Sequence, residues 1–480
     1  MPEVEPANAP ASVPQEEVAE VENSGGDGKA KLVMSILRQF IGVKDMANVR
    51  FSLPAQLIEP IPNLEYWNYL DRPDYFICIG DSDDPIERMM SLLRWYLTKD
   101  LKLVHGKICK PYNSVLGEFF RCNWNTASIP TTTLNVSMLD NIPTEAAVSA
   151  KSTSRFKSTF SRKAPTMNTT STNAPSSGPP TRSTSPTPST KSTGSASGPV
   201  IDARVDLPTP IRTAFLCEQT SHHPPVSAYI YSCPDKDIEA YGMDQIAARF
   251  TGTTIKVQPG EQNEGIFVNL KGRAEEYQCT HPTASICGFL RGSLYAAVQD
   301  TASITCTKTG LKAILWYKDE PWIGKPKYAM EGIVFKLDPK VKQDNIKDVS
   351  EDAIIARLDG CWKNKIYIFN PRSKERHVLL DVSDLAPATK VVPSFAQQKS
   401  NESRTVWDSV TQAILGKKFE TATKRKVDIE DAQRQVAKER AEKSEEFVPA
   451  YFKVNNDGRP TLTKAGEAVL AGQHNESWSF

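Results

Sequence analysis

The amino-acid sequence predicts an α+β protein built on one large antiparallel sheet, folded as a sandwich or a barrel. From about residue 247 to residue 382 the chain is a succession of β-branched and aromatic runs separated by turn residues. No helical pattern comes between these runs, so consecutive strands are joined by short connections and are antiparallel. Helical patterns lie before and after this region, at residues 86–99 and 404–446.

Composition excludes several classes of protein. The 480 residues carry 58 Lys and Arg against 57 Asp and Glu, so no net field favours nucleic acid as a partner. The nine cysteines are scattered singly without CxxC spacing, and we expect neither a metal nor a cofactor. Their odd number and the lack of a secretory leader favour the cytosol. No run of about 18 apolar residues occurs, so we expect only peripheral contact with membranes.

The amino-terminal region is expected to combine a tail with an amphipathic helix. Residues 1–28 are acidic and rich in proline and alanine, which predicts a disordered tail. The next segment places its apolar residues at helical spacing along one face, and Gly42 is the predicted stop. The apolar residues of this segment are Leu32, Val33, Ile36, Leu37, Phe40 and Ile41.

The chain then changes character. Residues 29–124 are expected to hold this helix, a helical layer and the first strands, with the best helix at 86–99 and Pro85 at its start. The composition of residues 125–200 predicts a disordered basic insert. Between residues 151 and 200 almost half of the chain is Ser or Thr and no Asp or Glu occurs, so too little apolar surface is available to offset the entropy of ordering.

Residues 201–385 are expected to form the main part of the sheet, and residues 386–480 a charged helical region. The strand predictions rest on β-branched and aromatic residues bounded by turn signals. The predicted strands are 247–257, 265–270, 303–317, 329–337, 365–369 and 377–382.

The most unusual string is EQTSHHPP at residues 218–225. Sterics before a proline push His223 towards an extended backbone, and Pro224 and Pro225 fix the next two φ angles. Charged histidines on so stiff a segment offer N–H donors that suit an anionic phosphate. One alternative is a rigid turn with structural histidines. Another is a hydrolase that uses Ser221, although no Gly-x-Ser-x-Gly elbow frames it, and a zinc site would need a third ligand nearby.

A second string, KPYN, begins at Lys110 and leads from a turn into an apolar strand. Lys110 and Asn113 are the polar donors at its start. On its own this string is equally typical of an ordinary loop lysine.

A third group lies in the late helical region, where Lys426, Glu430 and Arg434 are spaced by four. This spacing places all three on one stripe of a helix, with Glu430 and Arg434 in the favourable order for an ion pair. The alternative is a solvated charge ladder, because charge runs in helices are usually exposed.

Taken together, these strings resemble the fingerprints of the oxysterol-binding protein-related family, and the octapeptide is their most specific part. KPYN, followed by Gly117 and Glu118, is the second fingerprint. The resemblance covers residues 29–452 apart from the insert and is that of a short, fungal-like member without a pleckstrin-homology domain. It implies one incomplete antiparallel β-barrel that encloses a lipid tunnel, a carboxy-terminal helical region, and an amino-terminal helical lid at residues 32–41. Residues 29–480 would then form one lipid-binding domain; without the family, the lid segment reads as a docked core helix.

The resemblance further implies a lipid transfer protein and not an enzyme. It would bind one lipid at a time and exchange phosphatidylinositol 4-phosphate for a sterol between membranes. The alternatives are phosphatidylserine as the second lipid, or a lipid sensor or scaffold with the same pocket. We expect a cytoplasmic monomer, peripheral at organelle membranes or membrane contact sites, that touches anionic membranes. Ser114 departs from the proline that many members have there, which would loosen the turn. By match to the family motifs, the headgroup would contact Lys110, Asn113, His222, His223, Lys426 and Arg434, with Glu430 among them.

Overall fold

The computed structural model describes residues 59–105, 110–127, 210–288, 294–321, 325–455 and 457–475. All of them belong to one compact unit of the chain. The predicted acidic tail, the predicted lid at residues 32–41 and residues 128–200 of the predicted insert lie outside the described residues.

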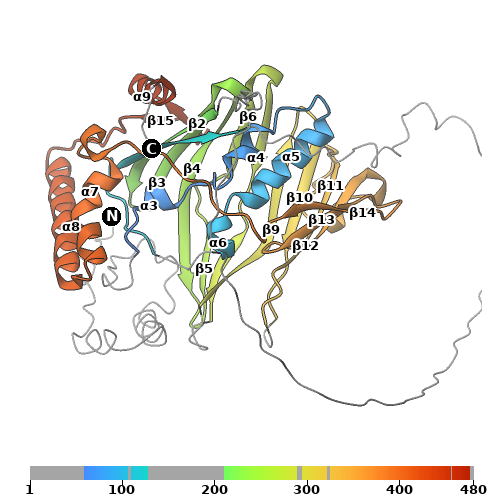
Figure 1. Cartoon of the computed structure of the whole chain (residues 1–480), viewed down its shortest axis with the longest axis horizontal. Coiled ribbons are helices and arrows are strands. Elements are labelled where there is room, and N and C mark those ends of the chain that lie inside the picture. The colour runs from blue at the N-terminus through green and yellow to red at the C-terminus, as the bar shows by residue number, and fades with distance from the viewer. Residues whose placement is uncertain are drawn as a thin grey trace, which may run out of the picture. The chain divides into compact units, whose positions relative to one another are not determined.

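A sheet of 14 antiparallel strands forms the body of this unit (Figure 1). The main path of hydrogen-bonded neighbours is β1-β2-β3-β4-β5-β8-β9-β10-β11-β12-β13-β14. The predicted fold class, an α+β protein on a large antiparallel sheet, is therefore confirmed. The strands are β1 (Phe119–Thr126), β2 (Ile211–His222), β3 (Pro225–Cys233), β4 (Ile238–Phe250), β5 (Ile255–Pro259), β6 (Ile266–Leu270), β7 (Glu275–Cys279), β8 (Thr283–Cys287), β9 (Tyr295–Cys306), β10 (Leu311–Tyr317), β11 (Ala329–Lys336), β12 (Ile354–Cys361), β13 (Lys365–Phe369) and β14 (Arg376–Asp381).

The sheet branches at β4 and at β9. The first half of β4 pairs with β6, whereas its second half pairs with β5. Likewise, the first half of β9 pairs with β8 and its second half with β7. Since β5 pairs with β8 and β6 pairs with β7, these six strands close a ring of pairings. The path itself ends at β1 and β14, which agrees with an incomplete barrel.

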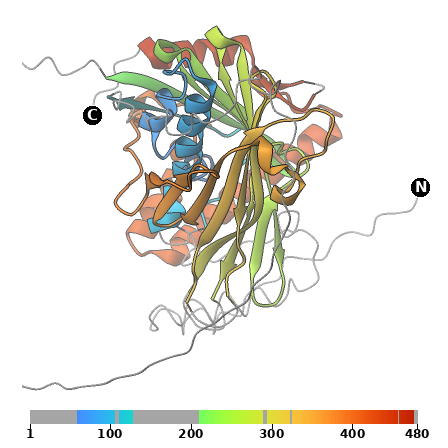
Figure 2. The ribbon, with the colours of Figure 1, turned by 90° about the vertical axis from the view of Figure 1, so that its right-hand side faces the viewer.

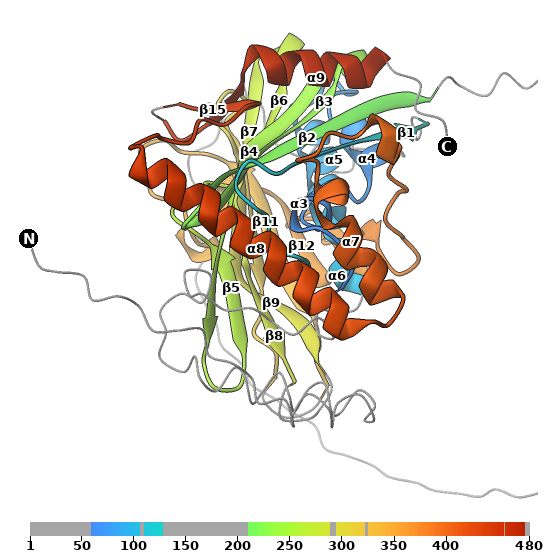
Figure 3. The same cartoon turned by 90° about the vertical axis from the view of Figure 1, so that its left-hand side faces the viewer.

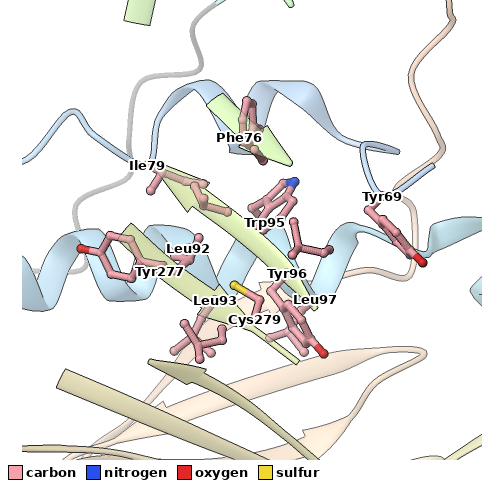
Figure 4. Close-up of a cluster of buried hydrophobic side chains, with 14 of the residues drawn as sticks. Tyr69, Phe76, Ile79, Leu92, Leu93, Trp95, Tyr96, Leu97, Tyr277 and Cys279 are labelled. Atoms are coloured by element: carbon pink, nitrogen blue, oxygen red, sulfur yellow. The ribbon is translucent and has the colours of Figure 1, made fainter. Parts of the chain in front are cut away.

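Helices α4 to α6 pack on one face of the sheet, where the main core lies (Figures 1 and 2). The α5 helix begins at Pro85 as predicted, because the Asp84 carboxylate caps it by accepting the Ile86 N–H at 2.6 Å. Its buried Trp95 lies against Phe76 of α4, and side chains of β7 close the same cluster (Figure 4). The helices in this part of the chain are α3 (Asn63–Tyr66), α4 (Pro73–Ile77), α5 (Pro85–Thr98) and α6 (Leu101–His105).

The strand predictions for β6, β11, β13 and β14 agree with the structure to within one residue. Two other strand predictions are wrong. The predicted strand 247–257 covers the end of β4 and the start of β5, and the predicted strand 303–317 covers the end of β9 and the whole of β10. Gly252 (φ +93°) and Gly310 (φ +67°) supply the left-handed backbone of these two turns. The β-branched residues on both sides hide the break. In addition, β1 runs to Thr126, two residues into the predicted insert.

The carboxy-terminal region is only partly helical. The predicted helical segment 404–446 is two helices, α7 (Ser403–Leu415) and α8 (Phe419–Glu442), which lie side by side and are joined by a turn after Gly416 (Figure 3). None of the helices that the structure describes is both long enough and apolar enough to cross a membrane. The remaining elements are β15 (Phe452–Val454), β16 (Pro460–Leu462) and α9 (Lys464–Asn475).

The last helix, α9, is tied to the first two strands by Gln473. The side-chain amide of Gln473 donates to the carbonyl oxygens of Cys122 in β1 (3.1 Å) and Phe215 in β2 (3.0 Å). In return, the Asn123 amide donates to the Gln473 carbonyl oxygen at 2.9 Å. The α9 helix is therefore docked on the part of the sheet from which both sequence strings extend.

Candidate functional site

The two histidines of the octapeptide lie at the tip of the β2–β3 hairpin. His222 ends β2 and pairs with Pro225 at the start of β3, and the peptide bond between His223 and Pro224 is cis. Both residues are exposed as a whole, although neighbouring groups partly enclose the His222 imidazole, and the two ring centroids are 4.7 Å apart. The turn therefore presents both rings from the end of the sheet.

The lysine string lies beside this hairpin. The Gly117 backbone N–H donates to the Gln219 carbonyl oxygen (3.0 Å), and the Gln219 N–H donates to the Glu118 carbonyl oxygen (2.8 Å). At the start of the string Lys110 and Asn113 are exposed, and the Lys110 ammonium donates to the Asn113 side-chain oxygen. The string and the octapeptide thus continue into neighbouring strands.

His222 is the point at which distant stretches of chain meet. The backbone of Ser114 in the lysine string and the charges of Glu430 and Arg434 on α8 all act on its imidazole. Loss of hydration and the neighbouring His223 lower the pKa of His222, while Ser114 and Glu430 oppose this shift. Without an anion nearby, the imidazole is therefore neutral over a wider range of pH than an ordinary histidine.

The residues Lys426, Glu430 and Arg434 form one stripe along α8. The Lys426 Nζ lies 2.9 Å from Glu430 Oε1, and Arg434 Nη2 lies 3.5 Å from Glu430 Oε2. Arg434 also pairs with Asp431. The Lys426 side chain is 6% exposed, whereas that of Arg434 is 57% exposed. A solvated charge ladder would not bury a lysine, so Lys426 departs from that alternative.

A small core holds the lysine string, α7 and α8 together. The buried Tyr112 ring stacks on Trp407 of α7, with ring centroids 4.8 Å apart, and its hydroxyl lies 3.0 Å from the Thr411 hydroxyl. Ala422 of α8 belongs to this core, and Ile429 packs against it. Because the stripe borders this buried face, the packing fixes the direction in which α8 presents its charges.

Sequence analysis did not single out the glutamates of the two strings. Glu118 is fully buried and accepts hydrogen bonds from Ser403 Oγ (2.6 Å) and Trp407 Nε1 (3.0 Å). Glu218 accepts three backbone N–H groups from residues 450–452 at 2.7 to 3.2 Å. Loss of hydration raises the pKa of Glu118 to about 7 and also raises that of Glu218. A carboxylate set within an apolar run is the sequence signal that could have found them.

The arrangement is suited to an anion. The guanidinium of Arg434 acts on the His222 imidazole at the tip of the β2–β3 hairpin, and the lysine string lies beside this hairpin. Charge-assisted donors of these kinds bind phosphate strongly. Among the described residues, no cluster of three or more His, Cys, Asp or Glu could hold a metal ion.

Comparisons with known proteins identify related chains. A family model described as "Oxysterol-binding protein" matches residues 32–414. The "Oxysterol-binding protein-like protein 1" of Schizosaccharomyces pombe is 42% identical, over 92% of this chain and 91% of its own length.

Solved structures share the fold. The Osh1 ORD domain in complex with ergosterol has a TM-score of 0.57 and 15% identity, and the match covers 93% of this chain and 89% of that one. The Osh3 ORD of Saccharomyces cerevisiae in complex with PI(4)P has a TM-score of 0.53 and 15% identity, covering 93% and 94%.

Proposed function

Because the chain belongs to the oxysterol-binding protein family, we propose that it transfers lipids between membranes, binding one at a time and exchanging phosphatidylinositol 4-phosphate for a sterol. It acts as a carrier and performs no chemical step on either lipid. The observation that supports this proposal most directly is the convergence on His222 of the lysine string and of Glu430 and Arg434 from α8.

The charges of the site match a phosphorylated inositol headgroup. Its phosphate carries nearly two negative charges at neutral pH and has three strong acceptor oxygens. Lys110 and Asn113 would meet it from the lysine string, His222 and His223 from the hairpin, and Lys426 and Arg434 from α8. Glu430, which already pairs with both cations of α8, would keep them in place or accept headgroup hydroxyls. Binding of the phosphate favours the charged imidazole, so His222 would take up a proton.

Apolar side chains on the inner face of the sheet would contact the apolar part of the lipid. The register aligns Ala248, Val257, Ala284 and Val298 in one row across β4, β5, β8 and β9. Val298 packs against the main core, so this row is on the inner face, yet all four side chains remain partly exposed. A bound acyl chain or sterol body would remove this apolar surface from water, at about 25 cal/mol per Å². The row therefore supports an apolar tunnel wall.

The lipids in the solved structures guide the choice of ligands. The Osh1 ORD domain was solved with ergosterol and with cholesterol, and the Osh3 ORD with PI(4)P. We propose both classes for this chain, with the lid segment at residues 32–41 closing over the bound lipid. The protein would work as a monomer, peripheral on anionic membranes at contacts between organelles.

Lipid transfer between liposomes tests the proposal. Donor liposomes carry phosphatidylinositol 4-phosphate and acceptor liposomes carry a sterol, and we expect each lipid to move only when the other is present. The double variant His222→Ala/His223→Ala should lose extraction of the phosphoinositide and keep that of the sterol. A matched control is His377→Ala, since His377 lies on β14 and is also partly exposed.

Equal extraction of the phosphoinositide by the double variant and the wild type would refute the assignment of the headgroup residues. Mass spectrometry of lipids that co-purify from cells provides an independent result. A phosphoinositide with a sterol agrees with the proposal, whereas a phosphoinositide with phosphatidylserine would replace the second lipid.

A further inference from the structure

Two buried carboxylates lie in the neighbouring strings of the candidate site, and their side chains point to opposite sides of the sheet. Glu118 ends the lysine string and Glu218 begins the octapeptide, and the residue after Glu118, Phe119, pairs with Glu218 across β1 and β2. Their exposed fractions are 0% and 1%. Within the described part of the chain, each hydrogen bond that they accept comes from a neutral donor. Burial of a carboxylate without a cation is costly, so hydrogen bonding must hold these groups in place.

Glu118 connects the lysine string to α7. Its Oε2 accepts the Val115 backbone N–H (2.9 Å) within the string and the Trp407 indole N–H (3.0 Å) from α7. Its Oε1 accepts the Ser403 hydroxyl (2.6 Å) at the first residue of α7. Since α7 shares a small core with Ala422, in the first turns of α8, Glu118 fixes the amino-terminal end of α8 through α7.

Glu218 holds the chain that leaves the other end of α8. Its carboxylate accepts the consecutive backbone N–H groups of Ala450 (2.7 Å), Tyr451 (2.8 Å) and Phe452 (3.2 Å). Only seven residues, 443–449, separate this point from the end of α8 at Glu442. The carboxyl-terminal end of α8 is therefore tethered to β2, four residues before His222 at the end of the same strand.

We propose that Glu118 and Glu218 are positioning residues that hold α8 from both ends, so that its charged stripe stays beside His222. The consequence for lipid binding rests on the proposed function, whereas the tethering itself does not. Each sequence string would then have two parts: one presents donors to the headgroup, and the other fixes the helix that supplies the remaining cations.

A carboxylate suits this role better than an amide of the same shape. Each glutamate receives three donors on two oxygens, and an ionised carboxylate has about four acceptor sites. A glutamine offers one acceptor oxygen and adds an N–H₂ group that would face the same donors. Glu118→Gln and Glu218→Gln should therefore loosen the tethers with almost no change in volume.

Hydrogen exchange on the lipid-free protein tests the tethering. We expect Glu218→Gln to lower protection of the amides of residues 450–452 and of the carboxyl-terminal half of α8. Glu118→Gln should lower protection of α7 and of the amino-terminal half of α8. The matched control is Glu275→Gln, a buried carboxylate that pairs with Arg88 elsewhere in the molecule. It should leave α7 and α8 protected as in the wild type.

Calorimetric titration with glycerophosphoinositol 4-phosphate, the soluble headgroup, tests the consequence. The titration is made at pH 8, above the pKa of about 7 of Glu118, so that this carboxylate is charged. Loss of hydrogen bonds to a charged group then predicts about tenfold weaker binding by either positioning variant and unchanged binding by the Glu275 variant. Uptake of sterol should be retained. If Glu118→Gln does not fold, Ser403→Ala removes the donor from α7 and leaves the carboxylate in place.

Unchanged protection of α8 together with unchanged headgroup affinity in both variants would overturn the proposal. If the wild-type protein itself fails to bind the headgroup, the proposed function is refuted, and the exchange data alone decide whether the tethers exist. Loss of protection in the Glu275 variant to the same extent would also overturn it, because a general loss of stability would then explain the result.

Discussion

The buried carboxylate of Glu118 illustrates how its surroundings change the chemistry of one residue. Loss of hydration raises its pKa to about 7, and the donors from Ser403, Val115 and Trp407 offset only part of this shift. A proton on Glu118 would also have an acceptor. Ser403 Oγ lies 3.2 Å from the Phe119 carbonyl oxygen and can turn its own proton there. The same network can therefore hold the charged or the neutral carboxyl group.

This raised pKa predicts a dependence of stability on pH. Between the ordinary pKa of 4.5 and about 7, the folded protein keeps the proton on Glu118 and the unfolded chain has lost it. The folded state then binds more protons, so the contribution of Glu118 to the free energy of unfolding falls as the pH rises through this window. Glu118→Gln cannot titrate. We expect the difference between wild type and variant to change by up to about 3 kcal/mol across the window.

Urea denaturation at a series of pH values between 4.5 and 8 measures this difference. The comparison with Glu118→Gln cancels other titrating groups, such as Asp244, whose pKa burial raises to about 6. A difference that does not vary with pH would show that Glu118 keeps an ordinary pKa.

At the scale of elements, the two cations of the α8 stripe differ in how deeply they are buried. Both flank Glu430, but Lys426 borders the small core and Arg434 extends into solvent. A buried cation is stripped of water and acts on a nearby phosphate through a low local dielectric, whereas an exposed cation is screened. Lys426 should therefore contribute more to headgroup binding than its position in a charge ladder suggests.

We expect Lys426→Met to weaken extraction of phosphatidylinositol 4-phosphate by about tenfold or more, because one charge-assisted hydrogen bond is lost. Methionine keeps the apolar stem of the side chain, so the helix should stay folded. Lys438→Met is the matched control on the same helix, since Lys438 is 71% exposed. Liposome extraction assays with both variants make the comparison, and equal losses would argue against a special role for Lys426.

At the scale of the whole molecule, the sheet brings together segments that are far apart in the chain. The lysine string precedes β1 and the octapeptide ends β2, and the two strands pair from Phe119 with Glu218 to Thr126 with Ile211. The predicted insert therefore lies between two neighbouring strands, which pair with each other up to Thr126 and Ile211. We propose that residues 29–480 act as one lipid-binding domain into which this insert is added.

Replacement of residues 128–209 by a short Asn-Gly turn should leave the fold and lipid extraction unchanged. The two strands would form an ordinary hairpin. The shorter connection lowers the entropy cost of loop closure by about 3 kcal/mol, which favours the folded state. Thermal unfolding and liposome transfer of the shortened protein check this expectation. Loss of folding would mean that the insert contributes to the sheet, whereas loss of membrane binding alone would give its basic residues a role in docking.

The sequence by itself determined the kinds of element and the chemistry of the strings. β-Branched and aromatic runs bounded by turn residues specified β6, β11, β13 and β14, and a helical pattern with Pro85 at its start specified α5. The stiff HHPP segment and the four-residue spacing on α8 were likewise local features. These could be predicted because propensity, capping and periodicity act over a few residues.

Only the tertiary structure decided how these parts combine. The branching at β4 and β9 and the burial of Lys426 depend on contacts between distant segments. The same holds for Glu118 and Glu218. In the sequence they are only members of the two motifs, and their proposed role as tethers emerges from their hydrogen bonds to α7 and to residues 450–452. Local patterns contain no information on which distant donors will surround a buried group, because the packing of the whole sheet and its helices selects them.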